Sequence, residues 1–305
     1  MKKLLITGAL KYTPNQIEQI RQQGCEVYFL QNESDALLPD HKGVEMVVCN
    51  GLFLHHALSE FKNLRFIQLT SAGMDRVPVD EIKKKGILLF NARGVYSIPM
   101  AEWAVLRVLE LYKNAKFFAT NQQSQKWEKC RTLKELYGKN VGIVGAGNVG
   151  QEVAKRFFAF GANCIGYDLF DIRFPFFQKV VRVSELKAQM GDLDVVILTA
   201  PHTPDTHHIM DYGLLKTMKE GAVLVNIARG GLVCEKDLIR ALQERKDLFA
   251  ALDVFEEEPL SADSPLWSME NVVVSPHNSF VSEGNNERLF SAILGNIVNY
   301  IKNCR

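Results

Sequence analysis

The chain has 305 residues, of which 47% are hydrophobic, and its 36 Lys and Arg nearly balance its 35 Asp and Glu. A chain this close to neutral lacks the charged surface of a protein that binds nucleic acid or an anionic membrane. Its apolar content excludes a disordered chain, and its length predicts about two domains.

The N-terminus is best interpreted as a buried strand over residues 4–7. Its apolar run is too short for a signal peptide, and no run in the chain reaches the roughly 18 residues of a membrane-spanning helix. The six cysteines are scattered and form no CxxC pair, which is typical of reduced thiols. We therefore expect a cytoplasmic protein.

Short apolar segments alternate with helical ones through the first third of the chain, which predicts a parallel α/β sheet. The expected strands are 4–7, 26–30, 46–49, 66–69 and 87–90. A long helix follows over 99–118, with apolar residues on more than one face. Either a second subunit or the rest of the chain would cover those faces.

A second alternation begins after a polar stretch at 121–129. Its expected strands are 141–144, 163–167, 195–199, 223–226, 250–253 and 272–274. The last segment, 285–303, has a helical pattern and could cross back to the first lobe. The sequence thus predicts two α/β domains.

Residues 145–150 read Gly-Ala-Gly-Asn-Val-Gly between an expected strand and an amphipathic helix. Such a GxGxxG turn presents backbone N–H groups and the positive end of a helix dipole to a pyrophosphate. Gly145 would permit the tight turn, Gly147 would let the ligand approach the backbone, and Gly150 would let the helix pack closely. This pattern predicts a dinucleotide site.

The strand after this helix ends at Asp168. A carboxylate there is placed to accept hydrogen bonds from the adenosine ribose and to repel a 2′-phosphate. We therefore predict NAD rather than NADP, although the nearby Arg173 weakens that preference. The alternative is a structural glycine turn beside a surface aspartate.

Three polar features follow the ends of later strands, where ligands of open α/β sheets bind: Arg229, the acidic run 256–258 and His277. Histidine suits proton transfer to a carbonyl during hydride transfer. A carboxylate would orient the imidazole and stabilise its cation, and a guanidinium can bind a substrate carboxylate. The alternatives are a structural ion pair, a solvated acidic run and a histidine that caps a turn.

In these motifs the chain resembles the D-isomer-specific 2-hydroxyacid dehydrogenases. The matching segments, in the family's order, are 145–150, 226–233 (NIARGGLV), 252–260 (LDVFEEEPL) and 271–277 (NVVVSPH). The resemblance implies two doubly wound parallel-sheet domains with an active-site cleft between them. A flavodoxin-like substrate domain would comprise 1–98 and 281–305, and a Rossmann NAD-binding domain would comprise 99–280.

The resemblance also implies the roles of the three polar residues. Arg229 would bind and polarise the substrate, and His277 would be the general acid in reduction and the base in oxidation. Glu258, directly before Pro259, would be the partner of His277. The choice of Glu258 over its acidic neighbours rests on the family match alone.

Ligand contacts are implied in the same way. Asp253 would contact the nicotinamide carboxamide. The other expected NAD-site residues are Gly145, Gly147, Asn148, Val149, Gly150, Asp168, Ala200, Ile227, Ala228, Arg229 and His277. In the first lobe, Ser71, Ala72 and Gly73 look like the family's substrate-carboxylate loop, and Asn50, Gly51 and Tyr96 would face the same cleft.

The implied function is hydride transfer between NAD(H) and a small 2-oxo acid, giving the D-2-hydroxy acid, by a homodimer. The apolar residues 52–54 favour a substrate with an uncharged substituent, whereas Arg76 and Arg93 could bind a phosphate or a second carboxylate. Glyoxylate, hydroxypyruvate, pyruvate and branched 2-oxo acids are therefore all candidates.

Two other functions stay open. One is an NAD-sensing interaction module, as in the C-terminal-binding-protein corepressors, and the other is a phosphoglycerate dehydrogenase without a regulatory domain. Departures from the family pattern at Cys234 and at 278–280 leave substrate choice undecided. We expect no metal site, because adjacent histidines at 55–56 and 207–208 would point apart on a helix and have no matching ligand cluster.

Overall fold

The computed structural model describes residues 1–303, which form two compact units. One unit comprises Met1–Tyr96 and the C-terminal segment from Ser282 onward, and the other is Ser97–Val281. The chain thus passes between the units twice. The domain boundaries expected after residues 98 and 280 lie beside these two crossings.

The first unit contains a five-stranded parallel sheet in the order β2-β1-β3-β4-β5. Its strands are β1 (Lys2–Thr7), β2 (Cys25–Leu30), β3 (Met46–Cys49), β4 (Phe66–Leu69) and β5 (Leu88–Phe90). This is the flavodoxin-like order, in which the winding reverses between β1 and β3. The carboxyl ends of these two strands are therefore where a ligand of this sheet is expected.

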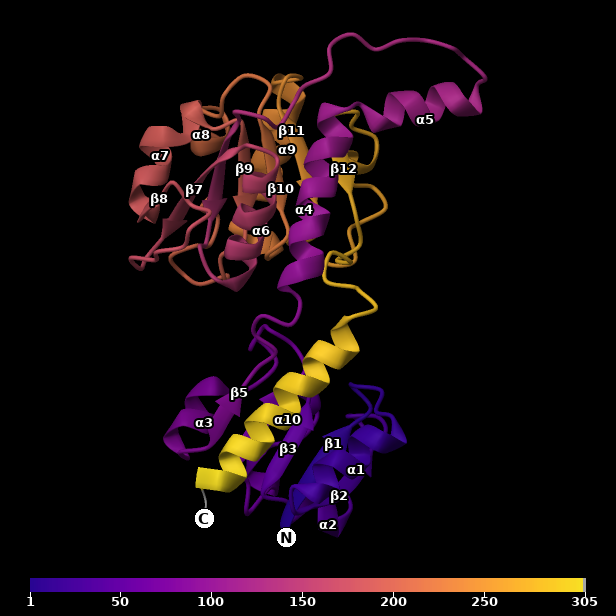
Figure 1. The fold of residues 1–305 in the computed structure, drawn as a ribbon, viewed down its shortest axis with the longest axis vertical. Coiled ribbons are helices and arrows are strands. Elements are labelled where there is room, and N and C mark those ends of the chain that lie inside the picture. The colour runs from indigo at the N-terminus through magenta and orange to yellow at the C-terminus, as the bar shows by residue number, and fades with distance from the viewer. Residues whose placement is uncertain (304–305) are drawn as a thin grey trace. The chain divides into compact units, whose positions relative to one another are not determined.

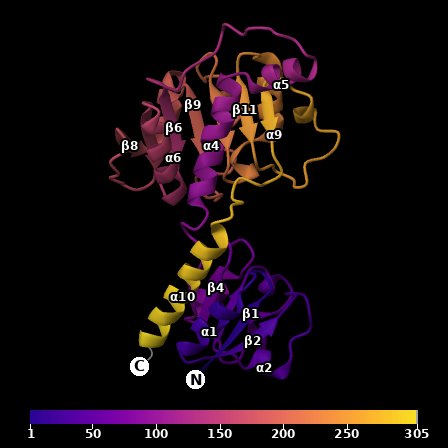
Figure 2. The ribbon, with the colours of Figure 1, turned by 45° about the vertical axis from the view of Figure 1, so that its right-hand side comes forward.

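Helices cover both faces of this sheet, which explains why its central strands are continuous apolar runs. The helices are α1 (Pro14–Gln22), α2 (Pro39–Lys42), α3 (Val79–Lys84) and α10 (Asn285–Asn303). Ile20 of α1 and Ile293 of α10 pack on one face with Leu4, and Ile82 of α3 packs on the other with Leu5. Figures 1 and 2 show α10, the last segment of the chain, lying along the sheet formed by the first residues.

The second unit contains a seven-stranded parallel sheet in the order β12-β11-β10-β9-β6-β7-β8. Its strands are β6 (Asn140–Val144), β7 (Asn163–Asp168), β8 (Lys179–Arg182), β9 (Val195–Leu198), β10 (Val223–Asn226), β11 (Phe249–Leu252) and β12 (Val272–Val274). This is the Rossmann order, and its reversal lies between β6 and β9. The two sheets confirm the predicted fold class.

Helices also cover both faces of the second sheet. They are α4 (Ser97–Tyr112), α6 (Asn148–Ala159), α7 (Leu186–Gln189), α8 (Tyr212–Leu215) and α9 (Glu235–Glu244). Helix α5 (Ala115–Gln123) follows α4 and stands away from the sheet (Figure 1). Val108 of α4 and Phe157 of α6 belong to the core on one face (Figure 1). Leu186, Leu215 and Leu238, from α7, α8 and α9, belong to the core on the other.

One expected element is wrong and one element was missed. The helix predicted over 99–118 is two helices, because Asn114 takes a left-handed conformation with φ of 50° and turns the chain between α4 and α5. Asparagine tolerates this conformation better than most residues. The edge strand β8 was not predicted, because only two of its four residues are apolar.

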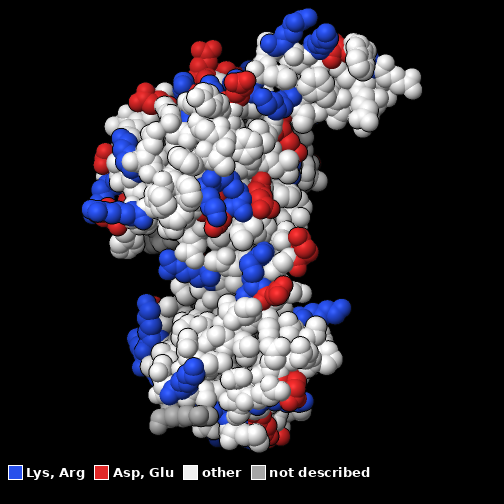
Figure 3. All heavy atoms as spheres, in the orientation of Figure 1, with Lys and Arg blue, Asp and Glu red and all other residues white. Residues whose placement is uncertain are grey.

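The surface agrees with the balanced composition. Charged side chains of both signs, separated by uncharged surface, appear on the visible face of each unit (Figure 3). Within residues 1–303, no helix is long and apolar enough to cross a membrane.

Candidate active site

The glycine-rich turn lies at the topological reversal of the second sheet, where β6 ends beside β9. Gly145 has φ of 98°, and a Cβ at this position would lie 2.6 Å from the backbone nitrogen of Ala200. Its N–H donates to the carbonyl of Tyr167 at 2.8 Å, and its carbonyl accepts from Thr199 Oγ1 at 2.6 Å. Both neighbouring strands therefore fix the turn, and Ala200 lies against it, while its predicted contact with NAD stays a prediction.

The other two glycines of the motif are needed for different reasons. A Cβ on Gly150 would lie 2.1 Å from the carbonyl oxygen of Gly145, so helix α6 could not pack on the turn. A Cβ on Gly147 would meet no atom of residues 1–303 within 4 Å, and φ there is an ordinary −73°. The fold does not require glycine at 147, whereas a ligand that approaches the N-terminus of α6 does.

Asp168 lies beside this turn at the end of β7. Its Oδ2 accepts from the N–H of Ala146 at 2.7 Å, and its Oδ1 accepts from the N–H of Phe170 at 3.1 Å. The half-buried carboxylate is thus held next to the glycine turn. At this position the carboxylate can accept hydrogen bonds from the hydroxyls of a ribose whose phosphate lies at the N-terminus of α6.

His277 and Glu258 form a hydrogen-bonded pair. His277 Nδ1 lies 2.8 Å from Glu258 Oε2, and Oε1 of the same carboxylate accepts from the N–H of Phe255 at 3.1 Å. A carboxylate only accepts, so Nδ1 carries the proton and Nε2 is the nitrogen left for proton exchange. Both side chains are about two-fifths exposed, 41% and 38%, which keeps them accessible to a ligand.

Asp253 holds the loop that carries His277. Its carboxylate is buried and accepts three hydrogen bonds, and its carbonyl accepts from the N–H of His277 at 2.7 Å. The three carboxylate donors are Ser275 Oγ (2.6 Å), the Asn278 N–H (2.9 Å) and the Ser279 N–H (2.8 Å). This holding role was not predicted, and the contact expected between Asp253 and a nicotinamide stays a prediction.

The loop of Arg229 lies against the loop of Glu258. A Cβ on Gly230 would lie 1.9 Å from the backbone of Phe255, so the two loops touch through their main chains. The side chain of Asn226 fastens the Arg229 loop by donating to the carbonyl of Arg229 at 3.0 Å and accepting from the N–H of Ala228 at 3.1 Å. Ile227 and Ala228 are buried in this loop.

In the first unit, the carbonyls of the loop 70–73 accept hydrogen bonds from nearby groups, whereas most of its N–H groups do not donate to the described residues. The N–H groups of Ser71, Ala72 and Gly73 donate to no atom of the described residues. The four carbonyls accept from Tyr96 Oη (Thr70), the Ala92 N–H (Ser71), Asn91 Nδ2 (Ala72) and Ser71 Oγ (Gly73). Successive backbone N–H groups without an internal acceptor can bind an anion, and the role of this loop in binding a substrate carboxylate stays a prediction.

Tyr96 supports this loop from behind. Its hydroxyl donates to the carbonyl of Thr70, and burial raises the pKa of the phenol. The phenol O–H is therefore a hydrogen-bond donor to this loop.

Asn50 and Gly51 use their N–H groups differently. Both donate to the carboxylate of Glu33, at 2.6 Å each. The Glu33 carboxylate therefore already binds the N–H groups of two residues that the sequence predicted to contact the substrate. Glu33 was not predicted, because its only signal is an acidic residue shortly after the second strand.

Cys234 lies before α9, and burial raises the pKa of its thiol. This position therefore favours a protonated side chain rather than a reactive thiolate. Among residues 1–303, no group of three or more His, Cys, Asp or Glu side chains is placed to hold a metal ion.

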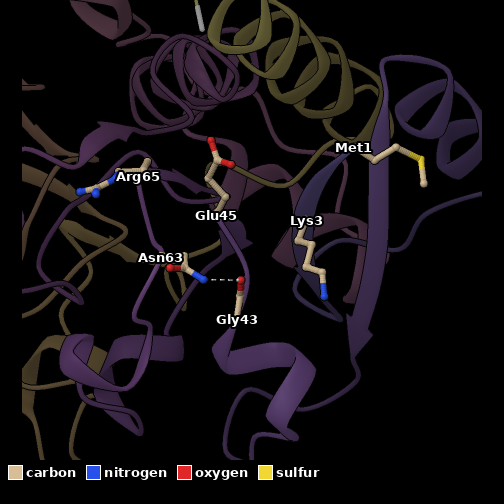
Figure 4. A pocket seen from close by; sticks show the side chains of 6 residues that line it. All are labelled: Met1, Lys3, Gly43, Glu45, Asn63 and Arg65. Carbon is tan, nitrogen blue, oxygen red and sulfur yellow. Dashed lines mark hydrogen bonds between the residues drawn. The ribbon is translucent and has the colours of Figure 1, made fainter.

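One surface hollow lies away from these loops. It has a volume of about 480 Å³ and is lined by Met1, Lys3, Gly43, Glu45, Asn63 and Arg65 (Figure 4). These residues stand at the amino ends of strands β1, β3 and β4, the edge of the first sheet opposite its own loops at 50–51 and 70–73. We therefore leave it out of the candidate site.

Comparison with known proteins gives consistent matches. The family model "D-isomer specific 2-hydroxyacid dehydrogenase, NAD binding domain" matches residues 105–279. A D-3-phosphoglycerate dehydrogenase of Methanocaldococcus jannaschii is 38% identical, over 74% of this chain and 43% of its own. A hydroxypyruvate reductase of Thermotoga maritima is 37% identical, over 71% of each chain. The chain spans about half the length of the first curated relatives it matches.

A solved structure is also similar over nearly the whole chain. The D-lactate dehydrogenase of Aquifex aeolicus, in complex with NAD and lactic acid, has a TM-score of 0.80 and 26% identity. The match covers 98% of this chain and 96% of that one.

The two glycines 147 and 150 offer a matched pair of alanine variants. Gly150→Ala should lose about 1–3 kcal/mol of unfolding free energy, because the added methyl meets backbone that cannot move aside. Gly147→Ala should unfold like the wild type yet bind NADH about tenfold more weakly or worse, which corresponds to roughly 1.4 kcal/mol. Thermal unfolding and NADH titration distinguish them, and tight NADH binding by Gly147→Ala would contradict the assignment of this turn.

Proposed function

Because this chain belongs to the D-isomer specific 2-hydroxyacid dehydrogenase family, we propose that it transfers a hydride between NAD(H) and a small 2-oxo or D-2-hydroxy acid. The observation that carries the proposal is the His277–Glu258 pair, held in the same Rossmann unit as a GxGxxG turn. A proton donor of this kind is what carbonyl reduction needs beside a hydride source. Bound NADH would supply the hydride.

His277 handles the proton in this proposal. With Nδ1–H donating to Glu258, the protonated ring releases the proton of Nε2 to the carbonyl oxygen as the carbonyl carbon receives the hydride. The carboxylate fixes the ring orientation and keeps the proton of Nδ1 directed at Glu258. In the oxidative direction the neutral ring takes the hydroxyl proton back.

Two groups are assigned to substrate binding. The free N–H groups of Ser71, Ala72 and Gly73 would bind a carboxylate, and the Arg229 guanidinium would polarise the carbonyl that is reduced. Arg229 Nη1 donates to the carbonyl of Ala228 at 2.7 Å, on a backbone that the Asn226 side chain holds in place. Preorganisation of this kind lowers the reorganisation that accompanies charge development in the transition state.

Asp168 supports NAD as the preferred form of the cofactor, because its negative charge would repel a 2′-phosphate. The apolar turn Leu52–Leu54 supports a substrate with an uncharged substituent. Glyoxylate and hydroxypyruvate fit this description, and one relative carries the name hydroxypyruvate reductase. The other relative is named D-3-phosphoglycerate dehydrogenase, and Arg76 is an exposed cation. For these two reasons 3-phosphohydroxypyruvate is included among the compounds tested.

The direct test is loss of NADH absorbance with a panel of glyoxylate, hydroxypyruvate, pyruvate, 2-oxoisocaproate and 3-phosphohydroxypyruvate, with NADPH in parallel. We expect turnover of at least one small 2-oxo acid whose substituent is uncharged, and faster turnover with NADH than with NADPH. NADH binding without turnover of any compound would favour the sensor function over the enzyme.

Removing the proton donor should separate chemistry from binding. His277→Ala should lower kcat about 10²- to 10⁴-fold, the usual contribution of a general acid, and should leave the Kd of NADH within about twofold, since the pyrophosphate turn is untouched. Stopped-flow turnover and NADH fluorescence measure the two quantities. Near-normal turnover would refute the role of His277.

Neighbouring glutamates provide a matched comparison for the carboxylate. Glu258→Gln should lower kcat about ten- to hundredfold, the effect of losing a charge-assisted hydrogen bond of roughly 1.5–3 kcal/mol. Glu257→Gln changes the same charge one residue away on an exposed side chain and should leave kcat unchanged. Equal losses from the two variants would show that the net charge of the acidic run matters, and not the contact with His277.

We also propose that the chain forms a homodimer through the helices that begin the second unit. Helix α5 and the loop after it stand away from the sheet (Figure 1), and much of their surface is uncharged (Figure 3). Leu106 of α4, Phe118 of α5 and Trp127 beyond it are 45%, 40% and 98% exposed. Exposed apolar side chains on α4, on α5 and in the loop after α5 support an interface there, because exposed apolar surface often marks an interaction site.

Light scattering coupled to gel filtration tests the dimer. The wild type should have the mass of two chains, and the double variant Leu106→Glu and Trp127→Ser should shift toward one. Phe170→Ser is the control, because Phe170 is an exposed aromatic residue (71%) in the loop after β7. A wild-type monomer, or equal dissociation by the control, would contradict this interface.

A further inference from the structure

One carboxylate in the first unit is bound by backbone N–H groups of a distant loop. Glu33 follows β2, and its Oε1 accepts from Thr7 Oγ1 at 2.7 Å and from the N–H of Asn50 at 2.6 Å. Its Oε2 accepts from the N–H of Gly51 at 2.6 Å. Glu33 therefore joins the carboxyl ends of β1 and β3, the two strands at which the winding of the sheet reverses.

The main chain of Glu33 contacts the other end of the same loop. His56 Nε2 lies 3.0 Å from the Glu33 carbonyl oxygen. The segment 50–56 is thus held at its start by the Glu33 side chain and at its end by the Glu33 backbone. Between these points lies the 3₁₀ turn Leu52–Leu54, whose own backbone bonds are local, such as Leu54 N–H to the Gly51 carbonyl at 2.9 Å.

The turn itself has one buried anchor and one exposed side chain. Leu52 is fully buried and Leu54 is 61% exposed, so the segment turns an apolar side chain outward at the carboxyl edge of the sheet. Because Leu52 is fully buried, it fixes how deeply this segment is placed in the first unit. The two N–H bonds to Glu33 fix where the segment starts, since no other described side chain accepts from them.

A carboxylate suits this position better than an amide. Two N–H donors and one hydroxyl point at the group, and a carboxylate offers acceptors alone. In a glutamine, the NH₂ would face one of these donors. Hydrogen bonds to an ionised acceptor are also roughly twice as strong as neutral ones.

We propose that Glu33 is a positioning residue that sets where the 50–54 segment meets the substituent of the 2-oxo acid. This inference rests on the proposed function, in which that segment borders the substrate. Glu33 acts through Asn50 and Gly51. Its loss should therefore change substrate affinity and leave NADH binding, which belongs to the other unit, unchanged.

The test compares Glu33→Gln with Glu45→Gln. Glu45 is a carboxylate of the same sheet that accepts from Lys2 Nζ and Tyr300 Oη, but it lies at the opposite, amino edge (Figure 4). Glu33→Gln should lower kcat/KM for the best 2-oxo acid about ten- to hundredfold, mainly through KM, as a displaced binding segment does. Glu45→Gln should leave KM and kcat near the wild type.

Amide hydrogen exchange of peptides spanning 50–56 gives a readout that does not depend on activity. Exchange should be faster in Glu33→Gln and unchanged in Glu45→Gln. Thr7→Val removes a single donor to Glu33 from a buried site of similar shape, and should show a smaller change in the same direction. It serves as the second variant if Glu33→Gln does not fold.

The outcomes separate this inference from the proposed function. Unchanged exchange at 50–56, or faster exchange with an unchanged KM, would overturn the positioning role while an active wild type leaves the proposed function intact. A wild type that binds NADH and turns over no 2-oxo acid would overturn both. Equal KM effects from Glu33→Gln and Glu45→Gln would also overturn the positioning role.

Discussion

The candidate active site depends on one buried charge, the carboxylate of Asp253. A buried carboxylate without partners costs several kcal/mol, so the chain around it must bring donors to both oxygens. It does so with the Ser275 hydroxyl and with the N–H groups of Asn278 and Ser279. These three bonds hold the loop that carries His277 in the shape seen in the structure. That shape places His277 at a left-handed φ of 51°, with its ring against Glu258.

The two units use the same device for different loops. In each, a carboxylate near the carboxyl end of the sheet accepts N–H groups from a loop that has little regular structure of its own. Asp253 shapes the loop of a residue that we assign to chemistry, and Glu33 shapes a segment that we assign to substrate fit. Carboxylates suit this task because they only accept, and backbone N–H groups are the donors that irregular loops leave unsatisfied.

The family, the two parallel sheets and the NAD cofactor could be predicted from the sequence and are confirmed. A buried parallel strand is a continuous apolar run, and each motif at a strand end is contiguous in the chain. Short stretches of sequence are therefore enough to predict both the strands and the motifs. The helix break at Asn114 and the edge strand β8 lack such a signal. The partners of Asp253 and Glu33 were missed because they depend on which strand ends are neighbours in the folded sheet.

Two loops that the sequence assigned together to substrate binding are chemically different. At 71–73 every carbonyl is used and the N–H groups are free, which is the arrangement that binds an anion. At 50–51 the N–H groups already serve Glu33, so they are not available to a second anion. We therefore assign the substrate carboxylate to 71–73 in the proposed function, and we assign to the 50–54 segment a mainly apolar contact with the substituent. Recognition of a charged substituent would have to come from a cationic side chain such as Arg76, whose Cδ would lie 4.0 Å from a Cβ on Gly51.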